Sequence, residues 1–85
     1  MKIFFSSKFK RSYKKLSQEL KKQAKEKEKI FRKNPFDSRL KTHKLHGEYK
    51  EYWSFSISGS HRIMLDFMNE KEIVFIDVGD HDIYN

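Results

Sequence analysis

The sequence has no cysteine, one proline and three glycines, and no apolar stretch approaches the length of a membrane span. Without cysteine the chain has no disulfide framework, no thiolate metal site and no cysteine nucleophile. The short run Ile3-Phe4-Phe5 cannot form the core of a signal peptide, so we expect a cytoplasmic protein. Few glycines and prolines leave little room for a linker. The 85 residues (1–85) therefore predict a single small domain.

The chain does contain aromatic side chains and a strongly uneven charge. Aromatic residues make up 15% of the sequence, which argues against disorder although apolar residues reach only 36%. Residues 7–33 carry twelve basic and three acidic residues, a net charge of +9, which leaves −2 for the rest of the +7 chain. Such a segment indicates a polyanion or an acidic protein as partner, although lysines that merely solvate a helix are an alternative.

The pattern of apolar residues changes once along the chain. Residues 2–5 read as a strand, and Ser6 or Ser7 can cap a helix after it. Apolar residues at helical spacing then extend to Phe31, and we expect two antiparallel helices separated near Ser17, ending at Asn34-Pro35. From residue 42 the period becomes two, which predicts a meander of strands. The expected fold is α+β: a small antiparallel sheet, joined by the first strand, with a helical hairpin on one face.

Strict alternation assigns each residue of the meander to one of two faces. The face toward the helices receives Trp53, Phe55, Ile57, Ile63, Leu65, Phe67, Val74, Ile76 and Val78. The second face is mixed and receives Ser54, Ser56, Arg62, Met64, Phe75 and Asp77. We expect Phe75 to pack within the protein rather than to stack on a nucleobase.

Four histidines lie in the strand half, at positions 43, 46, 61 and 81. His43 and His46 form an H-x-x-H pattern, but they point to opposite faces of a strand and no third ligand accompanies them. We therefore expect no metal site and no cofactor. Histidines could instead exchange protons during RNA cleavage while Arg62 stabilises the phosphate charge, although the composition alone does not require this reaction.

Several of these segments together resemble the RelE/ParE toxin superfamily, and within it the YafQ-like and RelE/StbE-like toxins. The resemblance rests on the string H-x-L-x-G, W-S, H-R-I and G-x-H-x-x-Y, found here at 43–47, 53–54, 61–63 and 79–84. It implies the toxin of a type II toxin–antitoxin pair, held by its cognate antitoxin in a hetero-oligomer. The implied activity is metal-independent cleavage of mRNA in the ribosomal A site.

The resemblance also implies roles for individual residues. His81 matches a proposed general acid, His43 a base or phosphate contact, and Arg62 an arginine that contacts the scissile phosphate. Tyr84 resembles a terminal tyrosine that stacks or positions, shifted by one or two places. The expected RNA contacts are Lys41, Lys44, His46, His61, Lys10, Arg11, Lys14 and Lys15.

The match to the family pattern is incomplete, and two alternatives remain open. Ser56 stands where YafQ-like toxins have a third histidine, and Lys41 and Lys44 at best represent the lysine pair of RelE. One alternative is a ParE-like toxin that inhibits DNA gyrase without a nuclease activity. The other is a non-catalytic module that binds an antitoxin.

Overall fold

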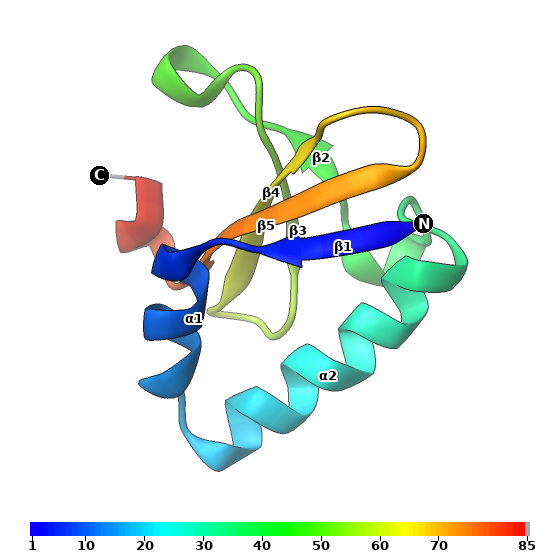
Figure 1. Cartoon of the computed structure of the whole chain (residues 1–85). Helices are drawn as coiled ribbons and strands as arrows, with labels where there is room; N and C mark the ends of the chain where they lie inside the picture. Colours follow the sequence, from blue (N-terminus) through cyan, green and yellow to red (C-terminus); the bar gives the residue numbers. More distant parts are fainter. Residues whose placement is uncertain (85) are drawn as a thin grey trace.

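The computed structural model describes residues 1–84 and shows two helices against one face of a five-stranded sheet (Figure 1). The strand order is β1-β5-β4-β3-β2. The strands are β1 (Lys2–Phe5), β2 (His43–Lys44), β3 (Trp53–Ser56), β4 (Arg62–Phe67) and β5 (Glu72–Gly79). The helices are α1 (Ser7–Lys14) and α2 (Gln18–Lys33), and three short 3-10 helices are η1 (Ser38–Leu40), η2 (Gly47–Tyr49) and η3 (His81–Tyr84). The predicted α+β class is confirmed.

Strand β1 makes the sheet mixed rather than purely antiparallel. It pairs in parallel with β5. The other three pairings, of β5 with β4, β4 with β3 and β3 with β2, are antiparallel. The expectation that the first strand joins the sheet is confirmed, and the chain can place it parallel because two helices lie between β1 and the meander. No helix within residues 1–84 is both long enough and apolar enough to cross a membrane.

Two serines set the helix starts. The Ser6 hydroxyl accepts a hydrogen bond from the backbone of Phe9 at 2.9 Å and donates one to the carbonyl of Ile76 at 2.7 Å. Ser17 caps α2 by accepting from the backbone of Leu20 at 3.1 Å. Each hydroxyl satisfies an amide that the first helical turn would leave unpaired. The prediction of two helices divided near Ser17 is therefore confirmed.

The core lies between the helices and the sheet and is largely aromatic. Phe31 of α2 is fully buried, stacks on Phe55 with ring centroids 4.8 Å apart, and meets Phe75 edge-on at 5.5 Å. Phe9 of α1 reaches the same ring of Phe75 at 5.6 Å. Large rings thus let a chain with few apolar residues build one continuous core.

The expected faces of β5 are wrong in part, because the strand contains a bulge. Met64 pairs with Asp77 and Leu65 with Phe75, so Ile76 is an extra residue in β5. Alternation resumes one residue later after such an insertion. As a result Ile73, Phe75 and Val78 face the helices, where Val74, Ile76 and Val78 were expected. Phe75 packs in the core as expected, but from the helix side rather than from the second face.

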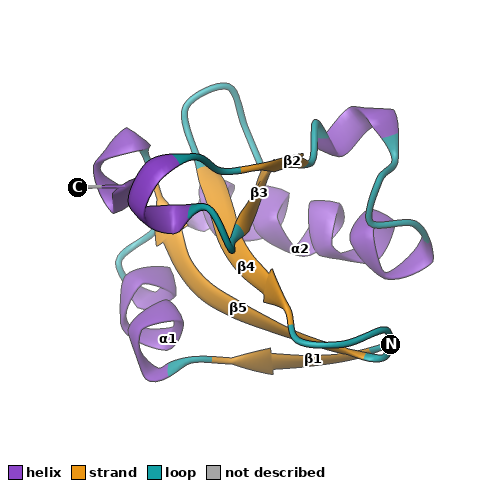
Figure 2. Cartoon of the chain, turned by 90° about the horizontal axis from the view of Figure 1, so that it is seen from above, coloured by secondary structure: helices purple, strands orange, loops and turns teal. Residues whose placement is uncertain are grey.

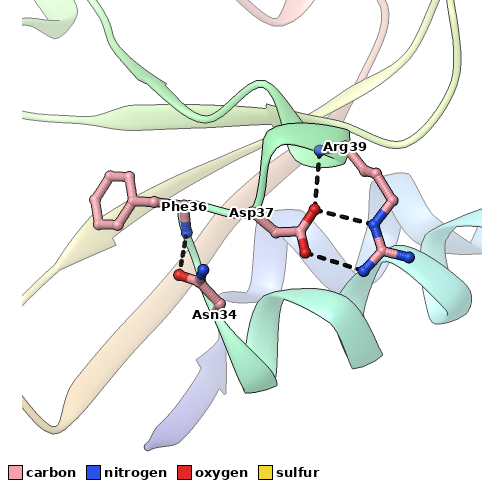
Figure 3. A network of polar contacts seen from close by, with 4 residues as sticks. All are labelled: Asn34, Phe36, Asp37 and Arg39. Carbon is pink, nitrogen blue, oxygen red and sulfur yellow. Dashed lines mark hydrogen bonds and ion pairs between the residues drawn. The ribbon is translucent and has the colours of Figure 1, made fainter.

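A polar network ends α2 and leads into η1 (Figure 3). Asn34 accepts a hydrogen bond from the backbone of Phe36, and the Asp37 carboxylate receives three from the backbone and guanidinium of Arg39. These hydrogen bonds from Arg39 lower the pKa of Asp37 to about 2. The turn delivers Leu40 into the core, where it is fully buried.

Candidate active site

Three predicted site residues meet where β4 begins and η3 follows β5. Arg62 is the first residue of β4, and one of its terminal nitrogens, Nη2, lies 3.3 Å from Nε2 of His81. The guanidinium carbon of Arg62 lies 5.7 Å from the ring centre of Tyr84, and the rings of His81 and Tyr84 meet edge-on at 6.5 Å. Residues distant in the sequence thus form one cluster.

The contact between Arg62 and His81 defines the proton arrangement. A guanidinium can only donate hydrogen bonds, so His81 Nε2 must accept and the ring proton resides on Nδ1. Protonated His81 could not accept this hydrogen bond. Arg62 Nε is buried and has no hydrogen-bond partner among residues 1–84. Nε is therefore an unpaired donor inside the protein, closed to an incoming anion in this conformation.

Tyr84 is held by a residue that the sequence did not single out for the site. Its hydroxyl donates a hydrogen bond of 2.8 Å to the hydroxyl of Ser54 on β3, and Ser54 is completely buried. A buried hydroxyl normally has a partner, since an unpaired one is costly. The terminal turn is thereby attached to the middle of the second face.

Gly79 allows the chain to fold back over the sheet. It is the last residue of β5 and pairs with Arg62 across the ladder. A Cβ atom at this position would lie 2.6 Å from the Cγ2 methyl of Ile83, closer than real Cβ atoms approach. Because Gly79 has no side chain, η3 can pack against this position. His81 and Tyr84 of η3 thereby come close to Arg62.

His43 shares the face of the cluster without contacting it directly. In β2 it pairs with Ser54, so both side chains project from the same face. Its Nδ1 lies 3.0 Å from the carbonyl of Lys41. Because a carbonyl only accepts, Nδ1 donates and Nε2 is the basic nitrogen of neutral His43. Within residues 1–84 no hydrogen bond joins His43 to His81 or Arg62.

The other predicted RNA contacts fall into separate places. His46 is exposed and lines a cavity together with Tyr84, whereas Lys44 pairs with Trp53 and so projects from the opposite face to His43. His61 precedes β4, and its Nδ1 lies 2.7 Å from the hydroxyl of Ser60. Lys41 has a left-handed backbone with φ of 54°. Lys44 and His46 also line one common cavity, whereas His61 lies in the turn before β4.

Helix α1 lies at the same end of the molecule as the terminal turn η3 in both views (Figures 1 and 2). The predicted contacts on this helix and its C-cap are all exposed: Lys10, Arg11, Lys14 and Lys15. Within residues 1–84 no three histidine or acidic side chains lie together as metal ligands would. The site thus combines a flanking helix rich in basic residues with a guanidinium, an imidazole and a phenol.

Comparison with known proteins identifies the family. Residues 1–84 match the model of the bacterial toxin of type II toxin–antitoxin systems, YafQ. The chain belongs to the YafQ toxin family. It is thus a toxin of a type II toxin–antitoxin system, as the resemblance of its motifs implied.

Solved structures of other toxins have the same fold as this YafQ-family toxin. YafQ from E. coli strain BL21(DE3) superposes with a TM-score of 0.78 at 20% identity, covering 96% of this chain and 94% of that chain. A YoeB/ParE toxin from Agrobacterium tumefaciens gives 0.79 at 19% identity over 95% and 99%. The RelB–RelE antitoxin–toxin complex from Methanococcus jannaschii gives 0.75 at 22% identity over 96% and 95%. Among curated protein sequences, none matches the chain.

Two residues that shape the site of this toxin, Ser54 and Gly79, were not predicted as site residues from the sequence. Ser54 was assigned correctly to the second face, and the available signal was its place two residues from Ser56 on the face that also holds Arg62. Gly79 stood inside the quoted motif, but the clash that makes glycine necessary depends on where Ile83 folds.

Proposed function

We propose that this toxin is a metal-independent endoribonuclease that cleaves mRNA, with Arg62, His81, His43 and Tyr84 as its site. The observation that carries the proposal is the cluster of a guanidinium, an imidazole and a phenol around Arg62. A guanidinium suits the charge that develops on a phosphate, because it presents several N–H donors in a fixed plane. The imidazole beside it supports the proposal, because imidazole can serve as a general acid or base.

The reaction requires a proton to leave and a proton to arrive. A base removes the proton of the 2′-hydroxyl, the oxygen attacks phosphorus, and the bond from phosphorus to the 5′-oxygen breaks. The departing 5′-oxygen takes a proton from an acid, which leaves a 2′,3′-cyclic phosphate and a 5′-hydroxyl. We assign the base to His43, whose Nε2 is the basic nitrogen, and the acid to His81.

His81 can act as the acid once an anion has entered the cluster. In the structure it accepts a hydrogen bond from Arg62, and protonation would break that contact. A phosphate between the two side chains would accept from Arg62 and compensate its charge. His81 could then hold its proton against the phosphate and deliver it to the leaving oxygen.

The ribosome is the proposed place of cleavage, because helix α1 carries exposed lysines and an arginine and lies at the same end of the molecule as η3 (Figures 1 and 2). Dense RNA backbone attracts such a surface through charge, and the attraction weakens with salt. This arrangement would present the transcript to η3 while α1 contacts ribosomal RNA.

The test is cleavage of a translated mRNA by purified toxin in a reconstituted translation system, mapped by primer extension. We expect His81→Ala to reduce the cleavage rate about 10²–10⁴-fold while the folded structure is retained. Glu26→Ala, an exposed change on α2, is the control and should cleave normally. Unchanged cleavage in His81→Ala would overturn the acid assignment, and inhibition of gyrase without RNA cleavage would favour the ParE-like alternative.

A cognate antitoxin is the proposed protein partner, in a hetero-oligomer. The E. coli DinJ–YafQ complex and the M. jannaschii complex show antitoxins bound to toxins of this fold. A cleft of about 440 Å³ between α1 and α2 has apolar walls that include Phe9 and Tyr13 and lysines at its rim. Coexpression with the product of the neighbouring gene should restore growth and give a copurifying complex, and failure of both would contradict this partner.

A further inference from the structure

A second cavity adjoins the cluster on the side of η2. It has a volume of about 360 Å³, within the ~300–1,000 Å³ typical of small-molecule sites. Its lining residues are Leu45, His46, Glu48, Tyr49 and Tyr84. Tyr84 thus belongs to both places: one neighbour of its ring is the guanidinium of Arg62, and another is the ring of Tyr49, 6.4 Å away and tilted by 51°.

The cavity wall is built from a short segment with a fixed backbone. Gly47 has a φ of +68°, a left-handed conformation that favours glycine, and it turns the chain into η2. The amide of Tyr52 donates to the carbonyl of Tyr49 at 2.8 Å, and the amide of Leu45 donates to the carbonyl of Tyr52 at 3.0 Å. Leu45 is buried, and these two hydrogen bonds hold the turn that carries Tyr49.

The lining combines the groups that recognise an unstacked base. Aromatic rings offer their faces to bases in single-stranded RNA, and polar side chains read the base edges. Here Tyr49 and Tyr84 supply the rings, while Glu48 and His46 supply polar groups. The position next to Arg62 is where the base beside a bound phosphate would lie.

Glu48 is the unexpected member, because a carboxylate repels the RNA backbone. Toward a ligand it can only accept hydrogen bonds, since an ionised carboxylate has no proton to donate. The Watson–Crick edge of guanine presents two adjacent N–H donors, N1–H and the N2 amino group, which match the two oxygens of a carboxylate. Adenine and cytosine each set an acceptor beside their amino donor, and uracil sets two acceptors around its single donor.

We propose that this cavity is a guanine-reading subsite, in which Glu48 accepts from the base edge while Tyr49 and Tyr84 contact the base face. The inference rests on the proposed nuclease function and adds a base preference to it. Glu48 is exposed to solvent, so the selectivity should fall at the weak end of the range for a two-point contact, about fivefold to tenfold over adenine.

The first experiment measures binding without cleavage. The full chain, labelled with ¹⁵N, is titrated separately with GMP, AMP, CMP and UMP while amide shifts are recorded. We expect GMP to bind about fivefold to tenfold more tightly than AMP and to shift the amides of Glu48 and Tyr49. Equal affinity for the four nucleotides, or shifts confined to residues outside the cavity, would overturn the proposal.

Two matched variants separate recognition from charge. Glu48→Gln keeps the length of the side chain but adds donors, and it should abolish the preference for GMP over AMP. Glu51→Gln removes the same charge three residues away, at a residue that does not line this cavity, and it should keep the preference. A preference that survives in Glu48→Gln, or is lost in both variants, contradicts the role of Glu48.

Cleavage mapping distinguishes this inference from the proposed function. Selective binding of GMP without any RNA cleavage would leave the subsite standing and overturn the nuclease. Cleavage sites that lack a guanine preference, and that are the same in wild type and Glu48→Gln, would leave the nuclease standing and overturn the subsite.

Discussion

Two short 3-10 turns, η1 and η3, begin alike and end differently. Each follows an aspartate whose carboxylate accepts from the backbone two residues later: Asp37 from Arg39, and Asp80 from Asp82, both at 2.9 Å. In η1 that later residue is a cation, which also binds the aspartate through its guanidinium. In η3 it is a second carboxylate, which can only repel the first.

The third residue of each turn repeats the contrast. Leu40 of η1 is fully buried in the core, whereas η3 has no buried residue and Ile83 remains half-buried against Gly79. The same local turn is thus secured by an ion pair and core packing in one place, and by the hydroxyl pair of Tyr84 and Ser54 in the other. Weakly held segments are typical of binding sites, where the chain must adjust to a ligand.

The largest expected effect separates the two turns by stability. Leu40→Ala should lower the free energy of unfolding by about 2–5 kcal/mol, because it opens a cavity in the core. Ile83→Ala, the matched change in η3, should cost about 1 kcal/mol or less. Urea denaturation of both variants checks this, and equal losses would show that η3 is as well packed as η1.

The next effect concerns activity rather than stability. Gly79→Ala places a methyl group against Ile83 and should move η3, lowering RNA cleavage by up to about 10²-fold, as small displacements of reacting groups do. The double variant Gly79→Ala with Ile83→Ala removes the clash and should recover most of the activity. A double variant as inactive as the single one would show that Gly79 acts through something other than this contact.

Much of this architecture could be predicted from local signals, and the exceptions have physical causes. The helix boundaries depend on local properties: the capping hydrogen bonds of Ser6 and Ser17, and the backbone restriction at Asn34-Pro35. The sequence was therefore sufficient to predict where the helices begin and end. The bulge at Ile76 changes which residues of β5 face the helices, and no residue type in the strand indicates a bulge there. Ser54 likewise required knowledge of where the chain end folds, since its partner lies 30 residues away.

A smaller effect tests the hydrogen bond that attaches η3. Tyr84→Phe and Ser54→Ala should each lower the free energy of unfolding by about 1 kcal/mol. Each variant removes one hydroxyl of the pair and leaves the other without its partner. The double variant should cost clearly less than the sum of the two, as expected for groups in contact. Strictly additive losses, measured by urea denaturation, would mean that the two hydroxyls do not interact.

The smallest effect returns to η1 and depends on pH. The hydrogen bonds from Arg39 lower the pKa of Asp37 from 3.8 to about 2. Between these two pH values the carboxylate of Asp37 is largely ionised in the folded protein but largely protonated in the unfolded chain. The stabilisation is therefore complete above about pH 4 and is lost as the pH falls toward 2. Thermal unfolding of wild type and Asp37→Asn should differ at about pH 5 and converge between pH 4 and 2. A difference that stays constant over this range would show that the pair of Asp37 and Arg39 does not stabilise η1 through its charge.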